Sequence, residues 1–168
     1  MENNFPDRLR ILVVDAERSM LDCYRDMLVN VPGTNPVRYP FAVEFCDRGD
    51  RALALVKQSI DDMNPFAVLF LALNLRHGPD GVRTGEQIRK MDPHVRIIIV
   101  TERTQIDSPN ILSHIPPEEK LLFINKPVNG ETLRQCAVVL GSQWKYDVPF
   151  RPYHARLEEQ WRREYWAY

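Results

Sequence analysis

Five short runs of apolar, largely β-branched residues constrain the fold of this chain more than any other feature of its sequence. The runs show no alternation of apolar and polar residues, and such near-continuous hydrophobicity is typical of strands covered on both faces in a parallel sheet. We therefore predict five buried strands, at Leu9 to Asp15, Phe41 to Cys46, Phe66 to Ala72, Arg96 to Thr101 and Leu121 to Asn125.

The segments between these runs have the spacing of amphipathic helices, with apolar residues three or four positions apart. A third helix is expected from about Val82 to Met91, and a short fourth begins at Ser108 and Pro109, because proline suits the first helical position. The residues predicted to face the sheet from the other three helices are Met20, Leu21, Tyr24 and Leu28; Ala52, Leu53, Val56 and Ile60; and Leu133, Cys136, Ala137 and Leu140.

Strand and helix thus alternate five times, which predicts an α/β fold. Because crossovers between parallel strands are right-handed, the alternation gives an open, doubly wound (βα)5 sheet with the flavodoxin-like strand order 2-1-3-4-5. In such sheets the ligand crevice lies at the carboxyl ends of the strands. Function is therefore expected at Asp15 to Glu17, Ala72 to Asn74, Thr101 to Glu102 and Asn125 to Pro127.

The chain of 168 residues has the length of one domain with a short appendage. We assign 1–143 to the domain, 144–152 to a linker and 153–168 to a C-terminal amphipathic helix. Asn30 to Pro40, rich in proline, is predicted to be a surface excursion. The C-terminal helix carries Tyr153, Leu157, Trp161 and Tyr165 at four-residue intervals. These residues either pack back on their own domain or form a dimer contact or a signalling helix.

Charge and composition exclude several classes of function. Lys and Arg number 22 against 23 Asp and Glu, a net charge of -1, so no overall attraction to nucleic acid or an anionic membrane is expected. No apolar window is long enough to span a membrane and no secretory signal is apparent, which favours a cytoplasmic location. Cys23, Cys46 and Cys136 lack the spacing of a disulfide scaffold or zinc site and are predicted to be reduced core thiols.

The first strand-to-helix turn, Asp15 to Ser19, contains no glycine, which argues against a dinucleotide or P-loop site. No G-x-S-x-G motif is present, and the four histidines lack the spacing of a metal site or hydrolase dyad. What remains at the crevice is a carboxylate (Asp15), a hydroxyl (Thr101) and an ammonium (Lys126).

These residues lie in segments that together resemble the receiver domain of two-component response regulators. The segments are ILVVDAE, FLALNL followed by GPDG, IIIVT and FINKP, and the resemblance covers about Leu9 to Leu140. In that family, two acids after the first strand and an aspartate after the third hold Mg²⁺. The strand-3 aspartate attacks a phosphohistidine or a small phosphodonor and becomes an acyl phosphate.

The resemblance implies a role for five residues of this chain. Asp15 matches the first acid, Asn74 the residue whose backbone carbonyl helps to hold the metal, and Thr101 the hydroxyl that contacts the phosphoryl group. Lys126 matches the phosphate-pairing lysine, and its bond to the following proline matches the family's cis peptide. Phe123 matches the aromatic residue that swings with the modification state.

Two positions depart from the family. The resemblance places Ala72 at the phosphoacceptor aspartate and Ala16 at the second acid, and a methyl group can neither attack phosphorus nor bind a hard cation. We therefore expect no aspartyl phosphate, no enzyme activity and no cofactor, with Mg²⁺ bound only if the missing acids are restored. Asp15 alone remains as a candidate ligand and is expected to pair with Lys126. Asp80 is expected to cap a turn or helix outside the pocket.

The leading interpretation is a receiver-like regulatory interaction module of two-component or phosphorelay signalling that cannot be phosphorylated as written. The alternative is a phosphoaspartate switch receiver inactivated by alanine substitutions at positions 16 and 72 and cut from a larger regulator. An unrelated flavodoxin-like enzyme or flavin carrier is a third reading. The expected partners are a histidine kinase, an output domain or a second copy. They would meet a surface that includes Ile111, Leu112 and the aromatic residues of 153–168.

Overall fold

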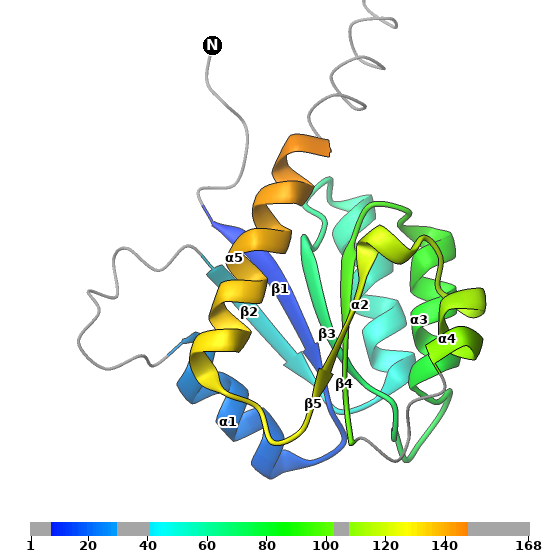
Figure 1. The fold of residues 1–168 in the computed structure, drawn as a ribbon. Helices are drawn as coiled ribbons and strands as arrows, with labels where there is room; N and C mark the ends of the chain where they lie inside the picture. The colour runs from blue at the N-terminus through cyan, green and yellow to red at the C-terminus, as the bar shows by residue number, and fades with distance from the viewer. Residues whose placement is uncertain (1–7, 30–40, 103–107, 148–168) are drawn as a thin grey trace, which may run out of the picture.

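The computed structural model describes residues 8–29, 41–102 and 108–147. They form one parallel sheet with the order β2-β1-β3-β4-β5, as the alternation of strands and helices predicts (Figure 1). Four of the five strands begin where the sequence indicates, and every strand ends within one residue of its predicted end. The strands are β1 Leu9–Val14, β2 Phe41–Cys46, β3 Val68–Ala72, β4 Arg96–Thr101 and β5 Leu121–Asn125.

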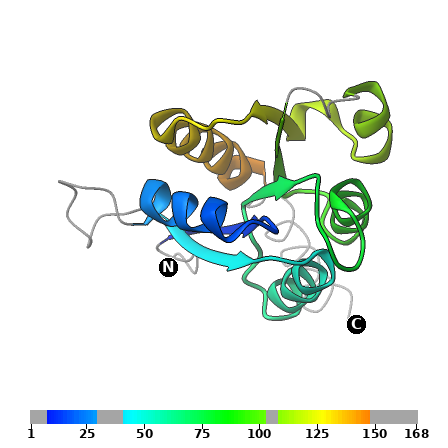
Figure 2. The same cartoon turned by 90° about the horizontal axis from the view of Figure 1, so that it is seen from below.

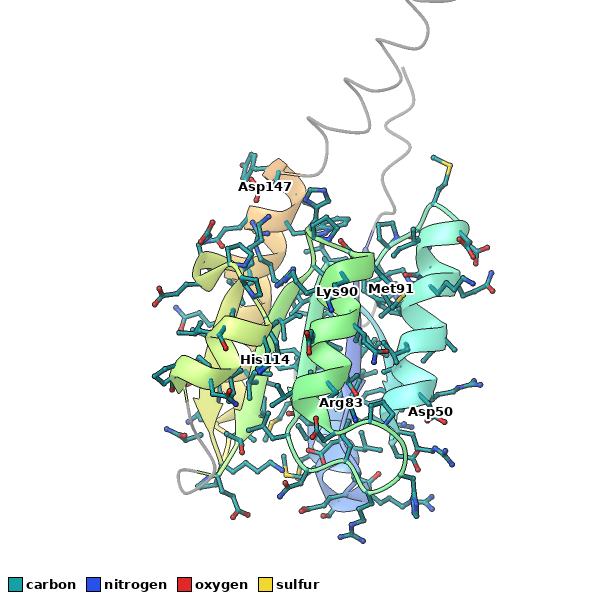
Figure 3. The ribbon with its side chains drawn as sticks, turned by 90° about the vertical axis from the view of Figure 1, so that its right-hand side faces the viewer. Asp50, Arg83, Lys90, Met91, His114 and Asp147 are labelled. Atoms are coloured by element: carbon teal, nitrogen blue, oxygen red, sulfur yellow. The ribbon has the colours of Figure 1, made fainter. Side chains whose placement is uncertain are left out.

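The helices cover both faces of this sheet. Seen from the carboxyl ends of the strands in Figure 2, α1 and α5 lie on one face, and α2, α3 and α4 lie on the other. In Figure 3, the helix that carries Lys90 (α3) lies between the helices that carry His114 (α4) and Asp50 (α2). The helices are α1 Arg18–Leu28, α2 Gly49–Asp61, α3 Gly81–Met91, α4 Ser108–His114, the 3-10 helix η3 Glu118–Lys120, and α5 Gly130–Asp147.

Two cores, one on each face of the sheet, explain the unbroken apolar runs. Successive side chains of a strand point to opposite faces, so Leu69 and Leu71 of β3 enter the core beneath α2, α3 and α4. Phe70, between them, enters the core beneath α1 and α5. There the centroid of its ring lies 5.6 Å from the centroid of the Tyr24 ring. A central strand here therefore has no position at which a polar residue would meet water.

The predicted boundary between domain and linker at 143/144 is wrong, because α5 continues to Asp147. Trp144 is 4% exposed and packs in the core beneath α1 and α5, and Arg96, at the start of β4, donates a hydrogen bond to the Asp147 carboxylate. These two contacts hold the last turn of α5 on the sheet. The remainder of the predicted linker, the excursion at 30–40 and the C-terminal residues Tyr153, Leu157, Trp161 and Tyr165 lie outside the described residues.

The prediction that all three cysteines are core thiols is correct for Cys46, which is buried, and wrong for Cys23, which is exposed. Cys136 is partly buried. Cys23 lies on α1 next to Tyr24, and because Tyr24 and Leu28 turn toward the sheet, their neighbour at 23 faces away from it. No helix among the described residues combines the length and the apolar content that a membrane span needs.

Candidate functional site

The carboxyl ends of β1, β3, β4 and β5 meet at one edge of the sheet, where the fold predicts a crevice. Ala72 of β3 pairs with Val100 of β4, and Thr101 of β4 pairs with Asn125 of β5. The pocket at this edge has about 20 Å³ of space for water, enough for about one molecule. Its lining consists of Asp15, Glu17, Ala72, Leu73, Asn74, Val100, Thr101, Glu102 and Lys126.

Asp15 forms the buried floor of this pocket and is 1% exposed. Its backbone N–H donates to the carbonyl of Cys46 at 3.2 Å, which holds the residue at the end of β1. Its Oδ1 accepts the backbone N–H of Glu17 at 2.9 Å. The second carboxylate oxygen, Oδ2, is left to face the pocket.

Lys126 supplies the positive charge opposite Asp15, as predicted. Its backbone N–H donates to the carbonyl of Thr101 at 2.9 Å, and its Nζ lies 3.3 Å from Asp15 Oδ2. The peptide bond between Lys126 and Pro127 is cis, as the resemblance implies. Because the Lys126 side chain is largely buried and Asp15 is almost wholly so, the two charges compensate each other away from bulk water.

Ala72 ends β3 between these groups and presents only a methyl group to the pocket. The start of α3 lies directly on it, because Gly81 donates its N–H to the carbonyl of Leu73 at 2.9 Å. A Cβ at position 81 would lie 2.2 Å from the carbonyl oxygen of Ala72, so glycine is required for this close approach. The backbone around Ala72 is therefore fixed by the packing of α3.

Other predicted site residues divide between the pocket and the core. Thr101, buried at the end of β4, and Asn74, exposed in the loop after β3, both line the pocket. Ala16 and Phe123 do not line it; both are partly buried and pack against the core beneath α2, α3 and α4. Val100 is a lining residue that the sequence did not single out, since an interior residue of an apolar strand carries no distinguishing signal.

Asp80 lies outside the pocket, as expected, and caps α3 by accepting the backbone N–H of Arg83 at 2.8 Å. The assignment of Ile111 to a partner surface is wrong, because its side chain is 2% exposed and lies in the core. Leu112 is partly buried and packs against the same core. The cause is the orientation of the short helix α4, which turns its apolar residues toward the sheet.

Negative charge predominates in the pocket lining, with the carboxylates Asp15, Glu17 and Glu102 against the single ammonium of Lys126. Proximity to Asp15 also contributes to the raised pKa of the Tyr24 phenol, after the larger effect of burial. In the described part of the chain, no three His, Cys, Asp or Glu side chains are close enough to share a metal ion. Of the three carboxylates that line the pocket, only that of Asp15 is buried.

Comparison with known proteins gives matches only at the level of structure. No family model matches the sequence, and no curated protein matches it.

Several solved structures share the fold. A CheY-like response regulator receiver domain from Methanospirillum hungatei is 20% identical, with a TM-score of 0.65, covering 83% of this chain and 98% of the other. The receiver domain of an HD domain-containing protein from Pseudomonas fluorescens is 16% identical, with a TM-score of 0.66 and coverage of 86% and 94%. A protein from Rhodopirellula baltica described as an adenylate cyclase is 21% identical, with a TM-score of 0.67 and coverage of 90% and 98%. The chain therefore has the flavodoxin-like fold of response regulator receiver domains.

Proposed function

We propose that this chain is a receiver-like regulatory module of two-component or phosphorelay signalling that acts by binding protein partners and accepts no phosphoryl group. The proposal includes a cytoplasmic location and no enzyme activity of its own. The partners that it implies are a histidine kinase or an output domain. Its support is the receiver fold together with the chemistry of the pocket at the strand ends.

The observation that carries the proposal is the methyl group of Ala72 at the end of β3, where the resemblance expects the phosphoacceptor aspartate. A methyl group has no lone pair with which to attack phosphorus. Lys126, which would pair with a phosphoryl group in a receiver, lies against Asp15 instead. The pocket thus keeps its cation but lacks the nucleophile that would use it.

The neighbouring carboxylates are poor substitutes for that nucleophile. Asp15 is buried and already accepts contacts from Lys126 and from the N–H of Glu17. Glu17 is exposed and belongs to the turn between β1 and α1, so it lines the same pocket but does not project from the end of β3. Neither group replaces a carboxylate projecting from position 72.

The second candidate is a phosphoaspartate switch inactivated by alanine at positions 16 and 72. The observation that favours it is the survival of Asp15, Thr101 and Lys126 around one pocket. In this reading the pocket is complete except for the missing acids, and restoring them returns phosphoryl transfer.

One experiment separates the two candidates. The full chain, the double variant Ala16→Asp/Ala72→Asp and the matched control Ala16→Asp/Ala72→Asn are incubated with acetyl phosphate and Mg²⁺, and the mass of each intact protein is measured. The unchanged chain is expected to gain no phosphoryl group, and a gain there would overturn the proposal. A hydroxylamine-sensitive gain in the double variant alone supports the inactivated switch, whereas no gain in any of the three supports the binding module.

A further inference from the structure

The strand β2 lies at one end of the sheet, next to β1 (Figure 1). Among the residues that the structure describes, no strand pairs with the other side of β2. Residues 42–45 of this strand are all partly exposed, whereas β3 and β4 are buried at every position. The outer side of an edge strand presents backbone N–H and C=O groups with which another strand can pair.

The hydrogen bonds between β1 and β2 show which backbone groups of β2 face outward. The carbonyl of Cys46 accepts the N–H of Asp15 at 3.2 Å, so the backbone groups of Cys46 face β1. In a parallel ladder a residue directs its N–H and its C=O to the same neighbouring strand, and successive residues alternate between the two sides. The N–H and C=O groups of Val43 and Phe45 therefore point away from β1.

The sequence of β2 lacks the features that usually protect an edge strand. Natural edge strands are guarded by lysine, by proline or by a β-bulge. β2 contains no lysine and no proline, and it pairs with β1 without a bulge from its first residue to its last. Its single charged residue, Glu44, is neutralised by the Arg10 guanidinium of β1 at 2.7 Å. The side chains of β2 therefore do not oppose the approach of another strand.

We propose that β2 pairs in antiparallel orientation with β2 of a second copy of this chain, so that the two sheets become one continuous sheet. The two copies would be related by a two-fold axis perpendicular to the sheet, through Val43. Val43 would then lie opposite Val43 of the second copy and exchange two backbone hydrogen bonds with it. Ala42 would lie opposite Glu44 of the second copy, and Phe45 opposite Phe41.

Charge complementarity favours a second copy, and it favours this register. Moving the axis to Glu44 would place two glutamates directly opposite each other, which destabilises a strand pair. With the axis at Val43, Glu44 lies opposite Ala42 of the second copy, and the next residue in line is Arg10 of the second copy, because Arg10 pairs with Ala42. Neighbouring strands are about 4.8 Å apart, so the Cα atoms of Glu44 and that arginine would be about 10 Å apart. Their long side chains can meet over the small Ala42 between them.

The other edge strand, β5, contains no charged residue that would select a register in the same way. Pairing through β2 would also leave the pocket accessible, since the described lining of the pocket includes no residue of β2. The pairing does not depend on the chemistry of the pocket. Failure of the phosphorylation experiment would therefore leave it intact.

The first test is sedimentation equilibrium of the full chain, of Val43→Pro and of the matched control Val43→Thr, across a range of protein concentrations. Because the N–H of Val43 points away from β1, proline there removes no hydrogen bond between β1 and β2, but it removes both bonds across the axis. The unchanged chain and Val43→Thr are expected to dimerise with equal dissociation constants. The dissociation constant of Val43→Pro is expected to be at least about ten-fold higher. Circular dichroism checks that all three proteins are folded.

The second test identifies the register and does not depend on the proline variant being folded. Residues that exchange backbone hydrogen bonds in an antiparallel pair have Cα atoms about 5.5 Å apart, within the range of a disulfide. Oxidation of Cys23→Ser/Val43→Cys is therefore expected to give disulfide-linked dimers.

The control for this second test is Cys23→Ser/Leu122→Cys, which places the new cysteine at an exposed position on β5, and it is expected to stay monomeric. A full chain that is monomeric at every concentration would overturn the proposal. Crosslinking through position 122 as readily as through position 43, or dimers of a folded Val43→Pro as stable as those of the unchanged chain, would also overturn it, because the contact would then lie elsewhere.

Discussion

Lys126 Nζ lies 3.3 Å from Asp15 Oδ2 across 111 positions of sequence, joining the end of β5 to the end of β1. The contact exists because two parallel strands that are not neighbours in the sheet both end at the same edge, with β3 and β4 between them. It places the ammonium of Lys126 against the carboxylate of Asp15. In the same pocket, Ala72 at the end of β3 contributes only a methyl group.

We predict that Lys126→Met lowers the free energy of unfolding by about 2 kcal/mol, because it leaves Asp15 as a buried charge without its cation. Lys90→Met is the matched control, since Lys90 also lies 3.3 Å from a carboxylate, Glu86, but is largely exposed. Its expected cost is below about 0.5 kcal/mol. Urea unfolding of Lys126→Met, Asp15→Asn, Asp15→Asn/Lys126→Met and the control Lys90→Met measures these free energies. If the double variant loses as much stability as the sum of the losses in Lys126→Met and Asp15→Asn, this account is contradicted.

The close approach of α3 to β3 predicts that Gly81→Ala destabilises the fold by about 3 kcal/mol. The added methyl would meet the backbone of Ala72 and Leu73 at 2.2 and 2.5 Å, and backbone atoms cannot move aside without displacing α3. Gly130→Ala, at the start of α5, is the control, because its nearest neighbour is the flexible side chain of Met27 at 3.2 Å. That substitution is expected to be neutral or stabilising by up to about 1 kcal/mol. Equal losses in the two variants would refute the steric explanation.

Helix capping gives a third prediction. Asp80→Ala removes the side chain that accepts the N–H of Arg83 at 2.8 Å and is expected to cost about 1 kcal/mol. Glu17 occupies the same position before α1, but its side chain makes no capping hydrogen bond, so Glu17→Ala is expected to change stability little. Thermal unfolding of the two variants compares them directly, and a larger loss at Glu17 would rule out capping as the cause.

The sequence was sufficient to predict the sheet because β3 and β4 are apolar at nearly every position and have helices on both faces. The pairing of Asp15 with Lys126 followed from the same topology, since it required only the ends of the strands to meet. Ile111 was assigned to a partner surface from the resemblance to receiver domains, and the short helix α4 offers too few turns to show from the sequence which of its sides faces the sheet.

The end of α5 was missed for a different reason. Trp144 and Asp147 are held by contacts with residues far away in the sequence, among them Arg96 at the start of β4. Such contacts leave no local pattern, whereas the prolines at 149 and 152 suggested an earlier boundary. Cys23 shows a related limit, because a cysteine beside an apolar stripe can fall on either side of a helix.

The pair formed by Arg96 and Asp147 predicts a dependence of stability on pH. The hydrogen bond from Arg96 holds the pKa of the Asp147 carboxyl below its usual 3.8. Because the folded-state pKa is the lower one, the stabilisation is complete above the unfolded value and is lost as the pH falls through the folded value. Asp147→Asn is therefore expected to cost up to about 1 kcal/mol at pH 7, since Asp147 is half exposed, and progressively less as the pH falls below 3.8. If the unchanged chain and Asp147→Asn still differ in their free energies of unfolding in acid, the packing of Asp147 and not its charge is the cause.

The three cysteines are expected to react with a thiol reagent at very different rates. Cys23 is exposed on α1, whereas burial raises the pKa of the Cys46 thiol to about 11 and also raises the pKa of Cys136. At pH 8 only about 0.1% of Cys46 would then be thiolate, the form that reacts, and the fold also restricts access to it. Titration with a disulfide reagent should show one fast thiol in the folded protein and three in urea. Cys23→Ser should remove the fast phase, and a fast phase that survives this substitution would show that α1 does not present Cys23 to solvent.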